Sequence, residues 1–407
     1  MSVDVRTRVD GSPVADDPAG FFGRRLPAAL DAGGAALAAA AAVLDLAPLE
    51  VAVAGERWTL ALEGGRVAVT AGPGGEGALR LALEPEQATD LEHDQVTPMG
   101  WFSSGRLALE GRLERLLDWW LVVRGALDGV VPHTGGSPTF TDQDGSPLDL
   151  GRSFAPDDDP GAMARFLEQT GFLHVTGVFG PDEMADVAAD MDRAAPTYHP
   201  GDGRSWWART DDGTQRLVRM QGFDAHSATV ASFPGDARLA RLGALTGDGH
   251  QWGGMEGNAI EALVKPIGVV EGISDVPWHK DCSLGRHSYE CCSLTMGISV
   301  TGADATSGQL RVVAGSNRVL VWPALRKRHD PLPVVDLPTR TGDVTVHLSC
   351  TLHMAQPPVE RERRVLYTGM RLPRPAPEAA DAALRRLREV RERAAVTVSQ
   401  PPAPARP

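Results

Sequence analysis

The stretch from about residue 260 to residue 372 restricts the fold more than any other part of this chain. Its apolar residues do not recur every three or four positions, as they would along an amphipathic helix. They occur instead in short segments separated by Gly, Pro and Asp. Short segments of this kind are typical of β-strands that form a sandwich or a barrel.

Helical patterns flank this region. Residues 159–169 and 182–194 carry apolar residues at helical spacing, and Pro181-Asp182 is a start signal for the second helix. Residues 377–395 predict a charged terminal helix, and the Pro-rich end of the chain predicts disorder. The C-terminal half is therefore expected to place helices before and after a β-rich core.

The N-terminal part alternates apolar and polar residues with a period of two, which indicates half-buried strands. Helices are expected within Ala29–Ala54, from Pro85 to Asp94 and at the end of Leu107–Leu121. These patterns predict a small α+β domain of antiparallel strands with helices on one face. The expected strands are Trp58–Leu62, Arg66–Thr70 and Ala78–Leu83, with a further strand after the helix of Ala29–Ala54 and a short one at the start of Leu107–Leu121.

A segment rich in Gly, Ser, Thr, Pro and Asp, Val131–Pro147, marks the boundary between the two parts. We therefore expect a domain over residues 20–130, a linker over 131–158 and a second domain over 159–375. A C-terminal helix over 376–396 and a disordered tail over 397–407 complete the expected organisation.

Charge and cysteine content exclude several classes of protein. The chain has 53 acidic and 40 basic residues and a formal charge of −13, which disfavours nucleic acid and suits a small organic substrate. Its four cysteines, with Cys291 next to Cys292, give neither a disulfide framework nor a CxxC zinc pair. The N-terminus has no secretion signal and Ala29–Ala54 is too weakly apolar to span a bilayer, so we expect a cytoplasmic protein.

Trp278-His279-Lys280-Asp281 contains the first candidate metal ligands. On a strand, residues two apart share a face, so His279 and Asp281 would point the same way. They would supply two ligands of a 2-His-1-carboxylate iron site. From 11 histidines and 53 acids in 407 residues, about 1.4 His-x-acid pairs are expected by chance, so the pair needs further support.

That support lies downstream. Gly342-Asp343 opens a strand that leads to His353, and Arg363 and Arg364 follow ten and eleven residues later. A guanidinium at that place could hold a dicarboxylate through two parallel hydrogen bonds. His347, on the same strand, is an alternative to His353 as the third ligand.

Residues from about 160 to 372 resemble the phytanoyl-CoA dioxygenase family of iron(II)/2-oxoglutarate oxygenases. Ser307–Arg318 is similar to the family's Gly-x-Leu-x-x-x-Pro-Gly-Ser-His segment, although Ala314 and Asn317 replace its Pro and His. The other matching segments, in the family's order, are Phe166–Val178, Pro181–Asp192, Pro277–Asp281, Gly342–His353 and Arg363–Leu366.

The resemblance implies a double-stranded β-helix (jelly-roll, cupin-like) domain within an α+β protein. It implies Fe(2+) held by His279, Asp281 and His353, with 2-oxoglutarate and O2 as co-substrates. Either Arg363 or Arg364 would anchor 2-oxoglutarate, because only one of two neighbouring strand residues can face the pocket. No catalytic residue beyond the metal ligands and no substrate-binding residue is assigned.

Two further features bear on the reaction that the resemblance implies. Asp281 is retained, whereas halogenating relatives lack this carboxylate, so we expect hydroxylation of a small lipid-like or secondary-metabolite substrate with release of succinate and CO2. Lys280 replaces a polar residue such as Gln between the ligands. Lys265, one expected strand earlier, is a further candidate contact of 2-oxoglutarate.

Residues from about 20 to 130 resemble a sterol-carrier-protein-like domain through Trp58–Thr70, Ala78–Leu91 and Gly105–Trp119. This resemblance implies capture of a lipid or acyl chain, and the alternative is a packing module without a ligand. Two rival functions stay open for the whole chain. One is a lipid carrier with an idle barrel, and the other is a cupin-type enzyme with three histidine ligands and no 2-oxoglutarate.

Overall fold

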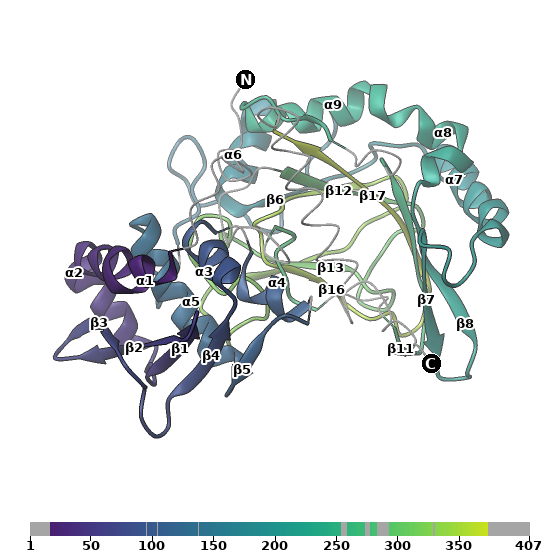
Figure 1. Cartoon of the computed structure of the whole chain (residues 1–407). Coiled ribbons are helices and arrows are strands. Elements are labelled where there is room, and N and C mark those ends of the chain that lie inside the picture. Colours follow the sequence, from purple (N-terminus) through teal and green to yellow (C-terminus); the bar gives the residue numbers. More distant parts are fainter. Residues whose placement is uncertain are drawn as a thin grey trace.

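The computed structural model describes residues 17–94, 96–103, 105–136, 138–253, 259–272, 277–282, 293–328 and 330–372. Figure 1 shows two parts side by side, a small N-terminal sheet with its helices and a larger β-rich part with helices along one side. The expected C-terminal helix and tail, Cys291 and Cys292 lie outside the described residues. The other two cysteines, Cys282 and Cys350, are both buried.

The N-terminal part is built on a five-stranded sheet in the order β3-β2-β1-β4-β5. Its neighbours are antiparallel except for β1 and β4, which run parallel, so the prediction of antiparallel strands is wrong for that pair. The parallel pairing is possible because β2 and β3 lie between β1 and β4 in the sequence, so the chain can return to the side of β1 opposite β2 and run in the direction of β1 again. The strands are β1 (Leu49–Val53), β2 (Glu56–Glu63), β3 (Arg66–Ala71), β4 (Leu79–Leu83) and β5 (Ala108–Glu110).

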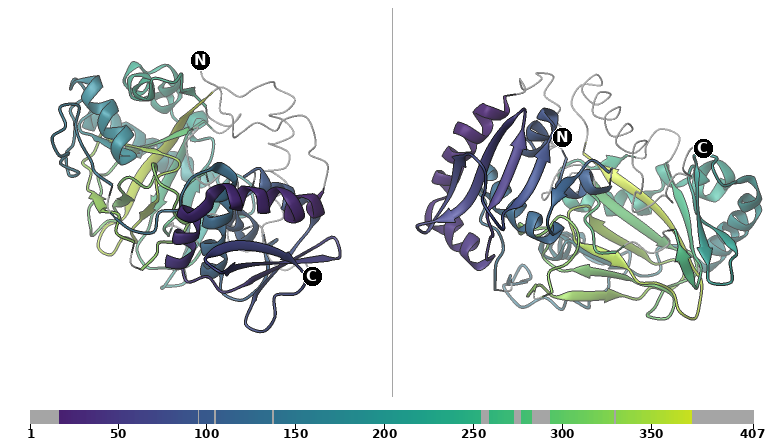
Figure 2. Two further views of the ribbon diagram at one scale, coloured as in Figure 1. Left: turned by 90° about the vertical axis from the view of Figure 1, so that its left-hand side faces the viewer. Right: turned by 60° about the horizontal axis from the view of Figure 1, so that its bottom comes forward.

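Helices pack against this sheet and bury its apolar side chains. Two large tryptophans of α5, Trp119 and Trp120, are almost completely buried, and α2 packs against α5. Figure 2 shows these helices beside the sheet from two directions. The helices are α1 (Pro18–Gly20), a π-helical turn η1 (Phe21–Arg25), α2 (Leu26–Val43), α3 (Pro85–Glu92), α4 (Pro98–Ser103) and α5 (Leu113–Asp128).

Among the described residues, the stretch Pro18–Val43 is long and apolar enough, with a mean hydropathy of 1.5, to meet the length and composition criteria for a membrane span. The same stretch places Leu26, Leu30 and Leu37 in the core of the N-terminal part. It also bends at Gly34, whose φ of 55° and ψ of −146° are not helical. A core helix can meet the same criteria, so the cytoplasmic location stays a prediction.

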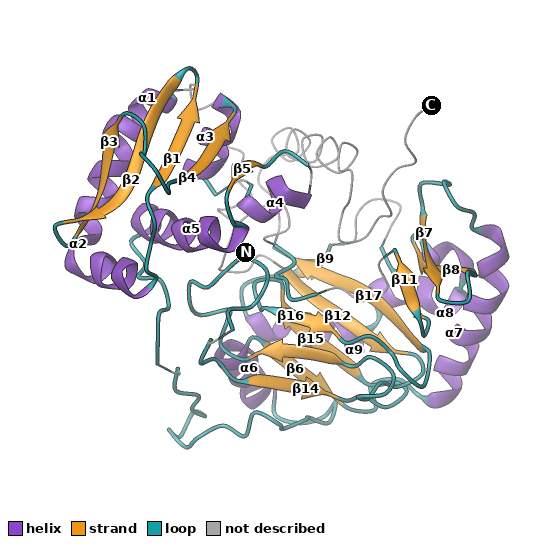
Figure 3. Ribbon diagram, turned by 90° about the horizontal axis from the view of Figure 1, so that it is seen from below, coloured by secondary structure: helices purple, strands orange, loops and turns teal. Residues whose placement is uncertain are grey.

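Within the described residues, the C-terminal part contains a large and a small antiparallel sheet, which confirms the prediction of short β-strands over residues 260–372 (Figure 3). The large sheet has the order β11-β7-β8-β10-β17-β12-β15-β6, with β9 also paired to β17, and the small sheet has the order β14-β13-β16. The strands are β6 (Phe172–Val175), β7 (Ser205–Thr210), β8 (Gln215–Met220), β9 (Gln251–Trp252), β10 (Glu261–Lys265), β11 (Val269–Glu271), β12 (Ser293–Ser299), β13 (Leu310–Val313), β14 (Val334–Leu337), β15 (Val344–Leu348), β16 (His353–Ala355) and β17 (Arg363–Arg371).

Helices cover the outer face of the large sheet. Both helices expected before the β-rich region are confirmed, and Met184 and Val187 of the second pack in one cluster with Met296 and Leu366 of the sheet. The longest of these helices are α6 (Pro160–Thr170) and α7 (Pro181–Ala194), and the shorter α8 (Ala228–Ala231) and α9 (Ala237–Gly243) follow.

Local signals explain where α6 begins and ends. Asp159 caps its first turn by accepting a hydrogen bond from the amide of Ala162 at 2.8 Å, and Pro160 occupies the first helical position. Gly171 ends the helix in the left-handed conformation with φ of 84°. The chain then turns directly into β6, an edge strand of the large sheet.

Alternation along the central strands gives the large sheet an apolar outer face and a polar inner face. Leu294, Met296 and Ile298 of β12 belong to the cluster beneath the helices. Thr295 and Gly297 between them point to the opposite face, toward the small sheet. This inner face is where the candidate site residues lie.

Candidate metal centre

His279 and His353 are far apart in sequence but lie directly opposite each other across two adjacent backbone segments. The amide of each donates to the carbonyl of the other at 2.9 Å. This pairing extends the small sheet beyond β16 and brings the two imidazole rings to a centroid distance of 4.2 Å. The backbone therefore places two candidate ligands side by side.

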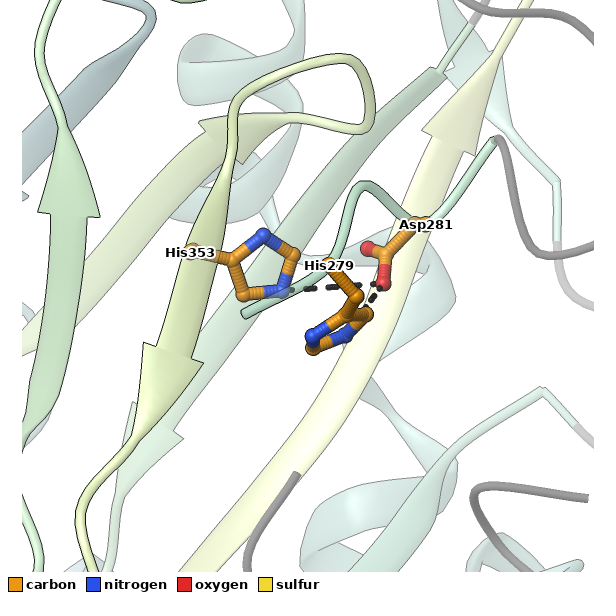
Figure 4. A group of neighbouring side chains, drawn as sticks. All are labelled: His279, Asp281 and His353. Carbon is orange, nitrogen blue, oxygen red and sulfur yellow. Dashed lines mark ion pairs between the residues drawn. The ribbon is translucent and has the colours of Figure 1, made fainter. Parts of the chain in front are cut away.

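Asp281 lies on the same face as His279, as the spacing predicts. Its Oδ1 is 3.3 Å from Nε2 of His279 and 3.6 Å from Nε2 of His353 (Figure 4). Its Oδ2 accepts a hydrogen bond from the Thr295 hydroxyl at 2.7 Å. One ligand atom from each of the two histidines and the aspartate lies within 4.8 Å of the others, close enough to hold one metal ion.

Both histidines are held in the tautomer that a metal requires. Nδ1 of His279 lies 2.7 Å from the carbonyl of Pro277, and Nδ1 of His353 lies 2.9 Å from the carbonyl of Thr351. A carbonyl only accepts, so each Nδ1 carries the proton and each Nε2 of the neutral ring carries a lone pair. These two lone pairs point toward the Asp281 carboxylate.

The pKa values of the site fit a neutral His353 beside an ionised Asp281. Burial lowers the pKa of His353 well below its ordinary value, and the neighbouring His347 and His279 add to that effect. Burial alone would raise the pKa of Asp281, but the surrounding imidazoles outweigh it and hold that pKa well below the usual range. The carboxylate is therefore charged and the imidazole uncharged near neutral pH.

His347, the alternative third ligand, also lies close to this group. Its Nε2 is 3.4 Å from Oδ2 of Asp281, and its ring centroid is 4.1 Å from that of His353. It differs from His353 in its other nitrogen, because the buried Nδ1 of His347 has no hydrogen-bond partner among the described residues. His353 therefore has the support from the backbone that an oriented metal ligand needs, and His347 does not.

Lys280 points away from the two candidate ligands that flank it, His279 and Asp281. Its side chain is completely buried, and its Nζ donates to the carbonyl of Ser316 at 3.1 Å. The Ser316 hydroxyl accepts from the amide of Leu352, the residue before His353, at 2.8 Å. The turn in which Ala314 and Asn317 replace the family's Pro and His thus connects the two ligand-bearing segments.

Arg363 and Arg364 point to opposite faces of β17. Arg363 pairs across the sheet with Lys265, is 4% exposed and donates to the carbonyl of Gly308 at 2.5 Å. Arg364 lies on the outer face, where it donates to the carbonyl of Ala188 in α7 at 3.3 Å. Only the first guanidinium shares the face of the metal centre.

Register fixes the position of Arg363 relative to the metal centre. Thr295, which contacts Asp281, pairs with Gly369 of β17. Paired residues lie on the same face of a sheet, and so does every second residue along a strand. Arg363, six residues before Gly369, therefore lies on the same face as Thr295. Tyr367 lies between them, and its hydroxyl accepts from Arg363 at 3.1 Å. Neither Thr295 nor Tyr367 is among the residues predicted from sequence, although the period of two from Arg363 reaches Tyr367.

Comparison with protein families identifies the C-terminal part. Residues 167–364 match the model of the family described as phytanoyl-CoA dioxygenase (PhyH). The chain contains a PhyH family domain. All five candidate residues fall within this PhyH domain, and the predicted cofactors, iron with 2-oxoglutarate and O2, are confirmed by the family match together with the His-Asp-His group. The match does not include the residues that resemble a sterol carrier, so that resemblance stays a prediction.

Three solved structures illustrate what this chain is similar to in fold. The epimerase SnoN in complex with Fe3+, alpha ketoglutarate and nogalamycin RO is 20% identical over 53% of this chain and 88% of its own, with a TM-score of 0.42. AviO1 from Streptomyces viridochromogenes Tue57 is 22% identical over 54% of this chain and 98% of its own, with a TM-score of 0.41. EctD from S. alaskensis with 2-oxoglutarate and 5-hydroxyectoine is 18% identical over 58% of this chain and 86% of its own, with a TM-score of 0.42. A sequence comparison with curated proteins finds no match.

Proposed function

We propose that this protein is an iron(II)- and 2-oxoglutarate-dependent oxygenase that hydroxylates a small organic molecule and releases succinate and CO2. The iron ligands are Nε2 of His279, a carboxylate oxygen of Asp281 and Nε2 of His353. One observation carries the proposal: two lone pairs and a negative charge converge on one point, which is unfavourable unless a cation lies between them.

The donor set fits ferrous iron. Two imidazoles and one carboxylate are the ligands of the facial triad, which leaves coordination positions for a co-substrate and oxygen. When bound, iron with 2-oxoglutarate and O2 supplies the oxidising chemistry. The protein holds the two Nε2 atoms in place through the carbonyls of Pro277 and Thr351, and Thr295 orients the carboxylate.

Arg363 is the proposed anchor of the distal carboxylate of 2-oxoglutarate. It lies on the inner face with the metal centre, while the outward-facing Arg364 forms an ion pair with Asp192 at 2.9 Å. Lys265 lies directly across from Arg363, so two cationic side chains share this end of the face. A doubly charged co-substrate that reaches from the metal to this pair would have both of its carboxylates matched by positive charge.

Hydroxylation is proposed as the outcome because Asp281 is retained as a ligand. A carboxylate at that position occupies the place that halogenating relatives leave for chloride. The net charge of −13 also favours a small substrate over nucleic acid.

The lipid-carrier alternative has less support. One cavity in the N-terminal part, of about 230 Å³, lies between α2 and the β2–β3 hairpin. Ligand pockets for molecules of drug size measure about 300–1,000 Å³, so this cavity is small for a lipid. Charged side chains at its rim, Asp31 and Arg66, pair with each other at 2.5 Å.

Succinate release from 2-oxoglutarate, measured with and without ferrous iron, tests the proposal. We expect iron-dependent succinate in the wild type and none above background in Asp281→Ala. Arg364→Ala is the matched control, because it removes a charge from the same domain on the outer face and should retain turnover. Iron-dependent succinate release that survives Asp281→Ala would contradict Asp281 as a ligand. Wild-type protein that binds iron without releasing any succinate would contradict the proposal and favour the cupin-type alternative, which uses no 2-oxoglutarate.

A further inference from the structure

The small sheet does not end at its metal-bearing edge. Beyond β16, His279 pairs with His353 on one side and with Ala324 on the other. The amide of Lys280 donates to the carbonyl of Pro323 at 3.3 Å, and the amide of Leu325 donates to the carbonyl of Trp278 at 2.8 Å. The segment Leu320–Leu325, which we call the outer segment, is therefore a further strand-like layer of the sheet that holds both histidines.

The N-terminal part covers this outer segment. Leu320, Trp322 and Ala324 belong to the hydrophobic cluster of the N-terminal part, together with Leu116 and Leu117 of α5. The amide of His133, just after that part, donates to the carbonyl of Leu320 at 2.9 Å. An uncovered sheet edge presents free backbone groups and is easily displaced, so this cover fixes the edge.

One charged side chain of the N-terminal part reaches into the contact. Asp118 of α5 is 6% exposed, and its Oδ1 accepts from the indole Nε1 of Trp322 at 3.1 Å. The same oxygen forms an ion pair with Nζ of Lys327 at 2.7 Å, and that ammonium lies 5.1 Å from the Trp322 ring centroid. A buried carboxylate with two donors from the outer segment and its continuation holds both in one position.

The outer segment has a backbone conformation that needs such support. Leu325 has φ of 60°, in the left-handed region that a leucine rarely adopts. Residues in this region persist where the surrounding contacts determine their conformation. The amide of this same residue donates to the carbonyl of Trp278, the residue before His279.

We propose that the N-terminal part is a fixed support of the metal centre and that Asp118 is a positioning residue for His279. Asp118 holds Trp322 and Lys327, the outer segment holds the backbone on both sides of His279, and that backbone sets the distance between His279 and His353. The proposal rests on the proposed function in that it takes these histidines as metal ligands. It gives the N-terminal part a role in the oxygenase reaction that requires no lipid.

The test measures metal affinity in the full-length protein without turnover. Ni(II) binding is titrated by calorimetry in the wild type, Asp118→Asn, Asp118→Ala and Trp322→Phe, with thermal unfolding of each metal-free protein as a check on folding. Loss of a ligand's hydrogen-bonding partner weakens metal binding about 10–100-fold, and Asp118 acts one layer further out. We therefore expect Asp118→Ala to weaken Ni(II) binding about threefold to tenfold, Asp118→Asn to weaken it less, and the Co(II) absorption spectrum of Asp118→Ala to shift.

Asp128→Asn is the matched control. Asp128 lies on the same helix and pairs with the buried Arg124 at 2.6 Å, within the N-terminal part. Its loss should lower the unfolding temperature and leave Ni(II) affinity unchanged. Wild-type affinity and spectrum in a folded Asp118→Ala, or an equal loss of affinity in Asp128→Asn, would overturn the positioning role. A wild type that binds no metal at all would instead contradict the proposed function.

Discussion

Asp343 and Asp281 are two of the aspartates in the C-terminal part that lie beside histidines, and their surroundings differ in kind. Asp343, in the turn before β15, is 2% exposed and accepts hydrogen bonds from the amides of Gly177 at 2.8 Å and Arg340 at 2.7 Å. Its Oδ2 also lies 3.0 Å from Nε2 of His174. Both carboxylate oxygens of Asp343 therefore contact groups of the protein itself.

Fewer hydrogen-bond donors of the protein contact the carboxylate of Asp281. Thr295 makes the one short hydrogen bond to its carboxylate among the described residues, at 2.7 Å, while Nε2 of His279, His347 and His353 lies 3.3 Å, 3.4 Å and 3.6 Å from its oxygens. Those distances are long for hydrogen bonds, and Nδ1 of His279 and of His353 faces a backbone carbonyl, which leaves Nε2 of each ring as the atom that would bind a metal. The comparison teaches that an aspartate beside a histidine is structural where protein donors satisfy it and suits a cation where they do not.

The largest expected effect is on Ni(II) affinity, which should fall on substitution of Asp281 and not of Asp343. Asp281→Ala should weaken Ni(II) binding by more than about 100-fold, since loss of even an indirect partner costs about 10–100-fold. Asp343→Asn should leave Ni(II) affinity unchanged and lower the free energy of unfolding by about 1–3 kcal/mol, because it disturbs buried donors. Calorimetry and denaturant unfolding measure the two quantities, and equal Ni(II) affinities in both variants would remove the distinction.

The same contrast holds for the two arginines of β17. Arg364 pairs with Asp192, whereas Arg363 contacts a carbonyl and the Tyr367 hydroxyl. A hydrogen bond to a charged group contributes about 1.5–3 kcal/mol, so Arg363→Ala should raise the KM for 2-oxoglutarate about 10–100-fold. Arg364→Ala should change it little. Steady-state succinate release over a range of 2-oxoglutarate concentrations measures both, and a reversed pattern would move the anchor to Arg364.

Local sequence signals predicted the helices of the C-terminal part and the short strands of its β-rich core. The capping residues Asp159 and Gly171 show why, since each acts within a few residues of the helix that it ends. The parallel pairing of β1 with β4 was missed, because the alternation of a strand does not say which neighbour it joins.

The candidate site was also predictable only where a local pattern determines it. Spacing of two puts His279 and Asp281 on one face, but the choice between His353 and His347 depends on what each Nδ1 contacts. That contact lies in the tertiary structure, as does the face that Arg363 takes on β17. The contact of Asp118 with Trp322 joins two parts of the chain that no local pattern relates.

At low pH, Asp343 should no longer contribute to the free energy of unfolding. Burial alone would raise the pKa of Asp343, but hydrogen bonds from His174 and from the amides of Arg340 and Gly177 outweigh it and hold that pKa below its ordinary value. A lowered carboxyl pKa stabilises the fold above the unfolded value of about 3.9, and this contribution is lost as pH falls toward the folded value. The stability difference between wild type and Asp343→Asn should thus be constant near neutral pH and shrink below about pH 4. Denaturant unfolding across pH measures it, and a difference that grows in acid would contradict the assigned contacts.

The smallest expected effect concerns the one hydroxyl that orients Asp281. Thr295→Val removes the hydrogen bond to Oδ2 and keeps the β-branched shape of the side chain. If that bond only orients a carboxylate that the metal itself holds, Ni(II) affinity should fall about tenfold, near the lower limit for loss of such a partner. Thr345→Val is the matched control, because Thr345 lies on β15 two residues before His347 and donates to the carbonyl of Gly297 at 3.4 Å. It should leave Ni(II) affinity unchanged. A loss in Thr295→Val as large as that in Asp281→Ala would mean that the hydroxyl determines whether the carboxylate reaches the metal, and Asp281 would then depend on a protein donor as Asp343 does.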